Sequence, residues 1–253
     1  MQTENPTDIA TDAAASVGGL ADGSGMGSFA DQAVQSAGFE NLAPPLQIAL
    51  FLGAMVLLSG ALVTITAFTR IVIVLSFVRR ALSTQEIPPT QVIIGLSLFM
   101  TLFVMAEPFN NITQKAVNPY FEQQVTMAEA FELAKDEMLG FMFQQLDNES
   151  GHESIDMFME ISNTTQASNF NEVPPHVIVP AFIIHELRLA FIMGFCIYIP
   201  FLLIDLVVST VLMSLGMMMM PPVIISTPCK LMLFVLVDGW GLVVGTLAMS
   251  FEV

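Results

Sequence analysis

Apolar and polar stretches alternate along the chain and predict where its helices lie. The first apolar stretch covers residues 47–78, and its first part, 47–68, is 22 residues long without a charge. At about 1.5 Å per residue, a helix of that length crosses a hydrocarbon core of about 30 Å. After a Pro-Pro turn at 88–89, a shorter apolar stretch covers 90–106. We therefore predict an N-terminal helical hairpin over 46–106.

A polar segment, residues 107–176, follows this hairpin and contains amphipathic helices. Within 125–146, apolar residues recur at steps of three and four, which is typical of a helix with one apolar face. These apolar positions are Met127, Phe131, Ala134, Met138 and Phe141. Thr126 and Glu129 have the spacing of a capping box, so the helix is expected to begin here. A second short helix is expected around Phe158.

The last part of the chain, 177–253, is apolar again and predicts further helical hairpins. Isolated charges divide it into apolar runs at 177–204, 206–229 and 231–251. The middle run contains four consecutive methionines, followed at once by two prolines. These residues are Met217, Met218, Met219, Met220, Pro221 and Pro222. Because proline lacks an amide N–H, we expect the helix to break here.

Composition indicates a membrane protein or part of a membrane-derived assembly. It is 54% hydrophobic and only 12% charged, about half the charged fraction of a soluble domain. The net charge of −16 excludes nucleic acid as a partner, since phosphates need a basic surface. Residues 1–42 have no Lys or Arg, so we interpret 1–45 as a disordered acidic leader rather than a signal sequence. The fold class is therefore all-α, built from membrane-derived hairpins with a polar helical insert.

Three of the seven basic residues, Arg70, Arg79 and Arg80, belong to the first hairpin and give it a basic tip. The positive-inside rule puts such a tip on the cytoplasmic side. The acidic insert and the leader would then be extracytoplasmic.

Five charges stand in or beside the apolar helices of the last part: Glu186, Arg188, Asp205, Lys230 and Asp238. A central charge costs about 2.5–3.5 kcal/mol in a lipid environment even by low estimates, so these groups need partners or water. Glu186 and Arg188 are two residues apart and face different sides of a helix. Lys230 is a natural partner for Glu186, or for Asp205. Such pairs fix helix register, or the acids form a proton path.

No catalytic motif is present, and we predict neither an enzyme nor a bound metal or cofactor. His185 begins a HELRL stretch, but Leu189 stands where a zinc protease helix has its second His. His185 is therefore interpreted as a packing or hydrogen-bonding residue. Cys196 and Cys229 form no C-x-x-C pair, and we interpret both as small core residues.

Three stretches carry a resemblance to the FliP/SctR family. They are FTRIVIVLSFVRRALSTQEIPPTQVIIGLSLFMTLFVM (68–105), VPAFIIHELRLAFIMGF (179–195) and IPFLLIDLVVSTVLMSLGMMMMPPVIISTPCKLMLFVLVDGWGLVVG (199–245). The resemblance covers roughly 47–251. Two departures are Ser83, where the family often has Gly, and Thr90, where it often has Asn.

The resemblance implies a subunit of the flagellar type III export gate, in the basal body at the bacterial inner membrane. It implies a helical ring with about five copies of this subunit. FliQ-like and FliR-like subunits, FlhB-like and FlhA-like export proteins, membrane lipid and unfolded flagellar cargo would be its partners. The alternative is a proton-conducting transporter subunit with Glu186, Asp205 and Asp238 as a relay.

A protein-conducting gate gives the methionines a role. Methionine is flexible and apolar, so a ring of such loops could form a deformable seal around irregular cargo. The other interpretation is that these residues fill a helix–helix interface. For the insert, whose two short helices are near the lower limit for an independent core, we expect Phe141 and Phe158 at subunit contacts.

Overall fold

The computed structural model describes residues 43–83, 88–163, 173–216 and 220–251, which are helical and contain no strand. This confirms the all-α prediction. The chain divides into two compact units, 1–61 and 62–253. Helix α3 (Pro44–Ile65) is the described part of the first unit and runs into the start of the second. The predicted acidic leader lies outside the described residues up to residue 42.

The N-terminal hairpin of the second unit consists of α4 (Phe68–Ala81) and α5 (Thr90–Val104). The apolar stretch over 47–78 contains two helices, because α3 ends at Ile65 and α4 begins at Phe68. Beyond the C-cap residue Leu82, Ser83 has φ 56°, a left-handed conformation that glycine adopts more readily. Serine stands here where the FliP/SctR family often has glycine, so it adopts a conformation that costs serine more than glycine.

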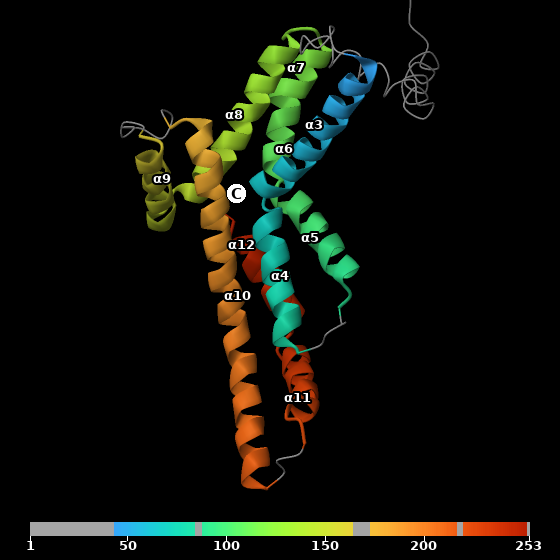
Figure 1. Ribbon diagram of the computed structural model, residues 1–253, viewed down its shortest axis with the longest axis vertical. Coiled ribbons are helices and arrows are strands. Elements are labelled where there is room, and N and C mark those ends of the chain that lie inside the picture. Colours follow the sequence, from blue (N-terminus) through green and yellow to red (C-terminus); the bar gives the residue numbers. More distant parts are fainter. Residues whose placement is uncertain (1–42, 84–87, 164–172, 217–219, 252–253) are drawn as a thin grey trace, which may run out of the picture. The chain divides into compact units, whose positions relative to one another are not determined.

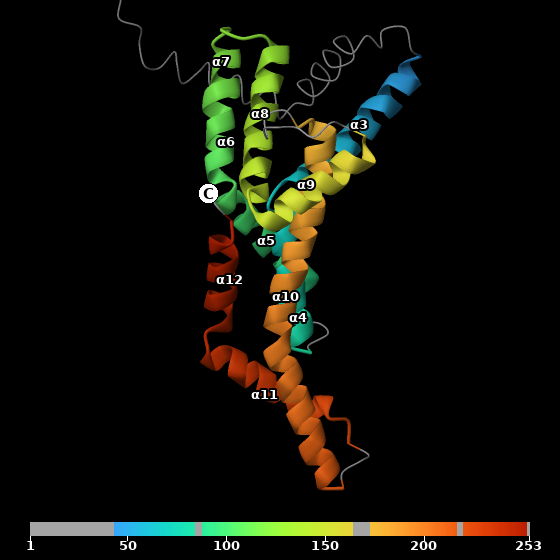
Figure 2. The ribbon, with the colours of Figure 1, turned by 90° about the vertical axis from the view of Figure 1, so that its left-hand side faces the viewer.

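The insert contains an antiparallel pair of helical arms (Figure 2). One arm is α6 (Ala106–Ile112), the π-helical turn η1 (Thr113–Val117) and α7 (Asn118–Phe121), and the other is α8 (Met127–Leu146). The first arm was not predicted as a helix. The capping box is confirmed, because the amide of Glu129 donates to Thr126 Oγ1 and the Thr126 amide donates to Glu129 Oε2 at 2.7 Å.

Helix α9 (Glu149–Ile161) follows α8 after a tight turn and packs against α10 (Pro175–Ser214). The sequence predicted a helix boundary near Ile204, but α10 continues through both HELR and Asp205. A single charged residue does not end a helix when its side chain has a partner. Glu186 of the HELR stretch is bonded by Arg70, and Asp205 is bonded by Lys230.

Two shorter helices complete the chain: α11 (Val223–Leu236) and α12 (Gly239–Met249). Helix α4 lies alongside α10 and is buried along one face, so these two helices form the centre of the core (Figure 1). Gly194 of α10 makes the close contact possible, since a Cβ there would lie 2.5 Å from a ring carbon of Phe77. Cys196 and Cys229, predicted in the core, are exposed.

Two described helices, Pro45–Ile65 and Pro175–Ser214, are long and apolar enough to cross a membrane. Two further spans are possible by length and composition if each bent pair acts as one. These pairs are Thr90–Val104 with Ala106–Phe121, bent by 57°, and α11 with α12, bent by 63°.

The turn between α8 and α9 depends on Gly151. An added Cβ would lie 2.3 Å from the carbonyl oxygen of Leu146, whereas a Cβ at Gly140 of α8 meets nothing within 4 Å. We expect Gly151→Ala to destabilise the protein by about 1–3 kcal/mol through overpacking. Gly140→Ala is the matched control and should stabilise α8 by about 0.5–1 kcal/mol. Thermal unfolding of the detergent-solubilised variants measures both; equal unfolding temperatures would contradict this account of the turn.

Candidate functional site

The methionine run lies where the chain leaves one helix and enters the next. Helix α10 ends at Ser214, and Gly216 adopts φ 76°, which only glycine tolerates freely. Pro221 and Pro222 come immediately before α11, with Pro222 as its N-cap residue at φ −59° and ψ −26°. Because φ near −65° suits the first turn of a helix, the prolines are placed to begin α11.

The predicted seal is described only at its last residue. Met217, Met218 and Met219 lie outside the described residues, and Met220 is 40% exposed. The described residues flanking the break also expose apolar side chains. These are Met213, Leu215, Val223 and Ile224. The end of α10 and the start of α11 therefore present an apolar surface on both sides of the break.

Glu186 of α10 pairs with Arg70 of α4. Arg70 Nε donates to Glu186 Oε2 at 2.8 Å, and Arg70 Nη2 donates to Oε1 in a second bond, which makes a bidentate contact. Both side chains are buried. The predicted pairing of Glu186 with Lys230 is therefore wrong. Arg70 was also misassigned to the basic tip. It is the third residue of α4 and lies on the buried face of that helix, where it meets the carboxylate of Glu186.

The guanidinium of Arg70 also reaches two further parts of the chain. Nη1 donates to the Ser250 carbonyl oxygen at 2.7 Å, and Nη2 donates to Gln145 Oε1 of α8 at 3.4 Å. The ring of Phe251 lies beneath the guanidinium, with 4.0 Å from Cζ to the ring centroid. One buried cation therefore joins α4, α8, α10 and the C-terminal end of the described chain. The sequence analysis did not predict these contacts.

His185 lies beside this ion pair and joins α10 to the α8–α9 turn. Its Nε2 is 3.1 Å from Asn148 Oδ1 and 3.1 Å from Ser150 Oγ. Asn148 is the N-cap residue of α9, where its Oδ1 accepts from the Gly151 amide at 2.8 Å. The predicted packing and hydrogen-bonding role of His185 is confirmed.

Lys230 of α11 pairs with Asp205 of α10, which was the second candidate from the sequence. Lys230 Nζ donates to Asp205 Oδ2 at 2.5 Å and to Ser83 Oγ at 2.6 Å. Lys230 is fully buried, whereas the Asp205 side chain is 37% exposed. The two acids of α10 therefore have separate basic partners, one on α4 and one on α11.

The other two charges expected in buried positions are exposed in the single chain. Arg188 lies on the outer side of α10 and donates to Glu153 of α9 at 2.8 Å, with both side chains at least half exposed. Asp238 has φ 50° and begins α12 as its N-cap residue. A position in an apolar stretch did not predict burial for these two charges. Only one side of α10 and of α11 is covered by other helices, and the residues on the other side are exposed.

The inner part of the insert packs against α10 within the chain, contrary to the expectation that Phe141 would lie at a subunit contact. Phe141 is buried, and its ring centroid lies 6.1 Å from that of Phe182 on α10. Phe158 is half-buried against the same core. The outer end of the predicted stripe is different, because Met127 and Phe131 are 72% and 68% exposed.

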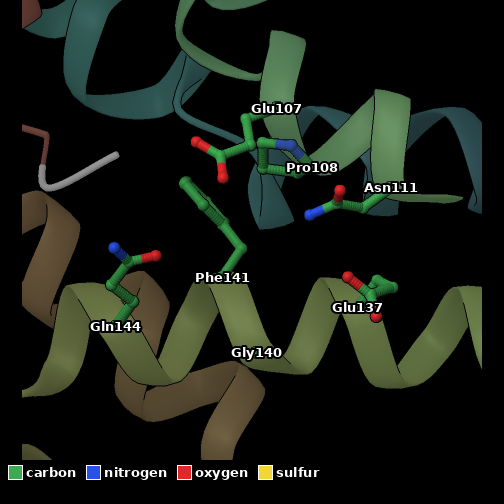
Figure 3. A pocket seen from close by; sticks show the side chains of 7 residues that line it. All are labelled: Glu107, Pro108, Asn111, Glu137, Gly140, Phe141 and Gln144. Carbon is green, nitrogen blue, oxygen red and sulfur yellow. The ribbon is translucent and has the colours of Figure 1, made fainter.

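A hollow of about 130 Å³ lies between α6 and α8, above the ring of Phe141 (Figure 3). Glu107 and Asn111 of α6 face Glu137 and Gln144 of α8 across it. Lys115 Nζ donates to Glu137 Oε1 at 2.5 Å, which neutralises one of the two carboxylates. Within the described residues, no group of three or more His, Cys, Asp or Glu side chains is placed to hold a metal ion.

The Arg70–Glu186 pair generates a stability prediction. Arg70→Met should destabilise the chain by about 3–5 kcal/mol, because the buried carboxylate of Glu186 loses its partner. The double variant Arg70→Met/Glu186→Met should recover most of that loss, since it removes both charges. Arg188→Met is the matched control at an exposed pair and should cost at most about 1 kcal/mol. Thermal unfolding in detergent checks all three. A double variant as unstable as the single one would show that the ion pair is not the cause.

Known proteins resemble this chain over most of its length. It is 45% identical over 216 residues to the "Flagellar biosynthetic protein FliP" of Borreliella burgdorferi, which covers 85% of this chain and 85% of that relative. It is also 45% identical over 212 residues to the protein of the same name in Bacillus subtilis, with 84% of this chain and 94% of that relative covered. The profile of the FliP family matches residues 51–247, which include both charge pairs and the methionine break. The chain belongs to the FliP family.

Proposed function

We propose that this chain is a pore-forming subunit of the flagellar type III export gate, through which unfolded flagellar subunits cross the bacterial inner membrane. Family membership supports a role in flagellar biosynthesis, the process named in the relatives. The methionine run between α10 and α11 would form the seal. The observation that carries this assignment is the break itself, where four consecutive methionines stand in the sequence between two helices with apolar side chains exposed on both sides.

Uncovered apolar surface supports assembly with other subunits. On α5, Phe99 and Phe103 are 75% and 74% exposed, and on α11, Val235 and Leu236 are 76% and 77% exposed. Soluble monomers rarely leave contiguous apolar surface of this kind uncovered, so lipid or protein must cover it. We propose a helical ring of about five copies with FliQ-like and FliR-like subunits, working with FlhB-like and FlhA-like export proteins.

The alternative function, a proton relay through Glu186, Asp205 and Asp238, has less support. A relay needs its acids to face water. Glu186 is fully buried in a bidentate pair with Arg70, and Asp205 bonds Lys230. Two of the three acids therefore have basic partners, which is the arrangement of a structural ion pair.

The seal is tested by replacing Met217, Met218, Met219 and Met220 together with Ala. Shortening the side chains removes volume without adding charge, so intact complexes should leak small ions. Loss of membrane potential in cells that express the variant measures the leak. The matched control is Met127→Ala with Met249→Ala, which shortens exposed methionines on α8 and α12, away from the run. Unchanged membrane potential in cells with normally assembled quadruple-variant complexes would mean that another element closes the pore.

A further inference from the structure

Lys230 is a buried cation whose two hydrogen-bond acceptors come from different parts of the chain. Its Nζ donates to Asp205 Oδ2 on α10 at 2.5 Å and to Ser83 Oγ just beyond α4 at 2.6 Å. An ammonium group removed from water needs its N–H donors satisfied. The hydroxyl of Ser83 therefore supplies Lys230 with a second acceptor beside the Asp205 carboxylate.

Ser83 supplies this acceptor from a strained backbone conformation. Its φ of 56° lies in the left-handed region, which non-glycine residues enter at an energetic cost. Its amide donates to the Arg80 carbonyl oxygen at 3.1 Å, so the conformation closes the C-terminal end of α4. A serine here combines a conformation that favours glycine with a hydroxyl that glycine lacks.

Helix α11 has few other attachments to the described chain. Its buried side chains are Ser226, Lys230 and Phe234, spaced four residues apart on one face. Phe234 packs on Phe201 of α10, with 6.1 Å between ring centroids. The remaining face of α11 is largely exposed and apolar. Placement of α11 within one chain therefore rests on this narrow stripe, with Lys230 at its middle.

Prolines make both helices deformable close to the Lys230 contacts. Pro200 lies inside α10, five residues before Asp205, and Pro228 lies inside α11, two residues before Lys230. Each removes one backbone hydrogen bond from its helix. The Lys230–Asp205 ion pair joins the two helices close to these prolines, so it limits how far either helix can bend at its proline.

We propose that Ser83 is a positioning residue that, together with Asp205, holds Lys230 and thereby sets the position of α11 relative to α10 and the end of α4. These three residues are called the Lys230 clasp. A change in the left-handed turn at Ser83 moves one acceptor away from Lys230, so the turn after α4 is coupled to the helix that follows the methionine run. The inference goes beyond the proposed function and does not depend on the methionine seal.

The two native cysteines allow a direct distance measurement. Cys196 of α10 and Cys229 of α11 are exposed and are the only cysteines in the chain. Spin labels on both report the α10–α11 distance by double electron–electron resonance. The full chain is measured in detergent, with labelled chains diluted in Cys196→Ser/Cys229→Ser chains so that distances between copies do not contribute.

The decisive variants are Ser83→Gly and Ser83→Asn. Glycine adopts the left-handed conformation freely but removes the acceptor, so the single narrow distance peak of the native chain should be lost. Asparagine tolerates the same conformation and keeps a side-chain oxygen, so it should retain the narrow peak. Thr210→Ala is the matched control. The Thr210 hydroxyl donates to the Val207 carbonyl oxygen of its own helix at 2.9 Å, so its removal should leave the distance unchanged.

A narrow native distance in Ser83→Gly would overturn the proposal. Equal broadening in Ser83→Gly and Ser83→Asn would also overturn it, since the acceptor would then not be the cause. Thermal unfolding of Ser83→Gly should remain cooperative, because the left-handed strain that glycine relieves offsets part of the cost of the lost hydrogen bond. Broadening without loss of folding is the signature of a positioning role, and it is obtained whether or not the methionines seal a pore.

Discussion

The buried guanidinium of Arg70 is the constraint on which the rest of the second unit depends. Taking an ion out of water costs several kcal/mol unless its donors are all satisfied. Arginine has five N–H donors in a rigid planar fork, and here they meet Glu186, Ser250 and Gln145 while the flat face lies over Phe251. The acceptors come from three parts of the chain outside α4. Those parts must come together around α4 before the cation is stable in the core.

Helix α10 connects this centre to the Lys230 clasp. Glu186 and Asp205 stand on the same helix, 19 residues apart, which corresponds to roughly 29 Å at the rise of an α-helix. Between them α10 packs against α4, where Gly194 lets the Phe77 ring approach closely. The Arg70–Glu186 pair joins α4 to α10 at one end, and Lys230 links Asp205 of α10 to Ser83, just beyond α4, at the other. Apolar packing fills the space between.

The contrast between the two ion pairs follows from their surroundings. Arg70 and Glu186 are enclosed by α8 and the C-terminal residues, so their charges interact in a medium that screens them weakly. Asp205 is partly exposed, and α11 beside it is bound along a narrow stripe. The region around Asp205 and α11, next to the methionine break, is thus less extensively packed than the region around Arg70. Such regions are where proteins undergo local rearrangement.

Local sequence was enough to determine several features of this protein. The capping box at Thr126, the amphipathic period of α8 and the break before Pro221 depend on neighbouring residues and on backbone sterics, so the pattern alone predicts them. Family membership was likewise visible in short motifs.

Only the tertiary structure decided which charges meet and which side chains are covered. Arg70 and Lys230 are both basic residues within apolar stretches and distant in sequence from Glu186. Nothing in the spacing favours Arg70, 116 positions away, over Lys230 as its partner. The same applies to Phe141, whose ring is covered by Phe182 of a distant helix, and to Arg188, which the packing of α10 leaves outside. Helical periodicity specifies which residues share a face. The element that covers that face is selected by packing and charge over the whole chain, and those energies are not local.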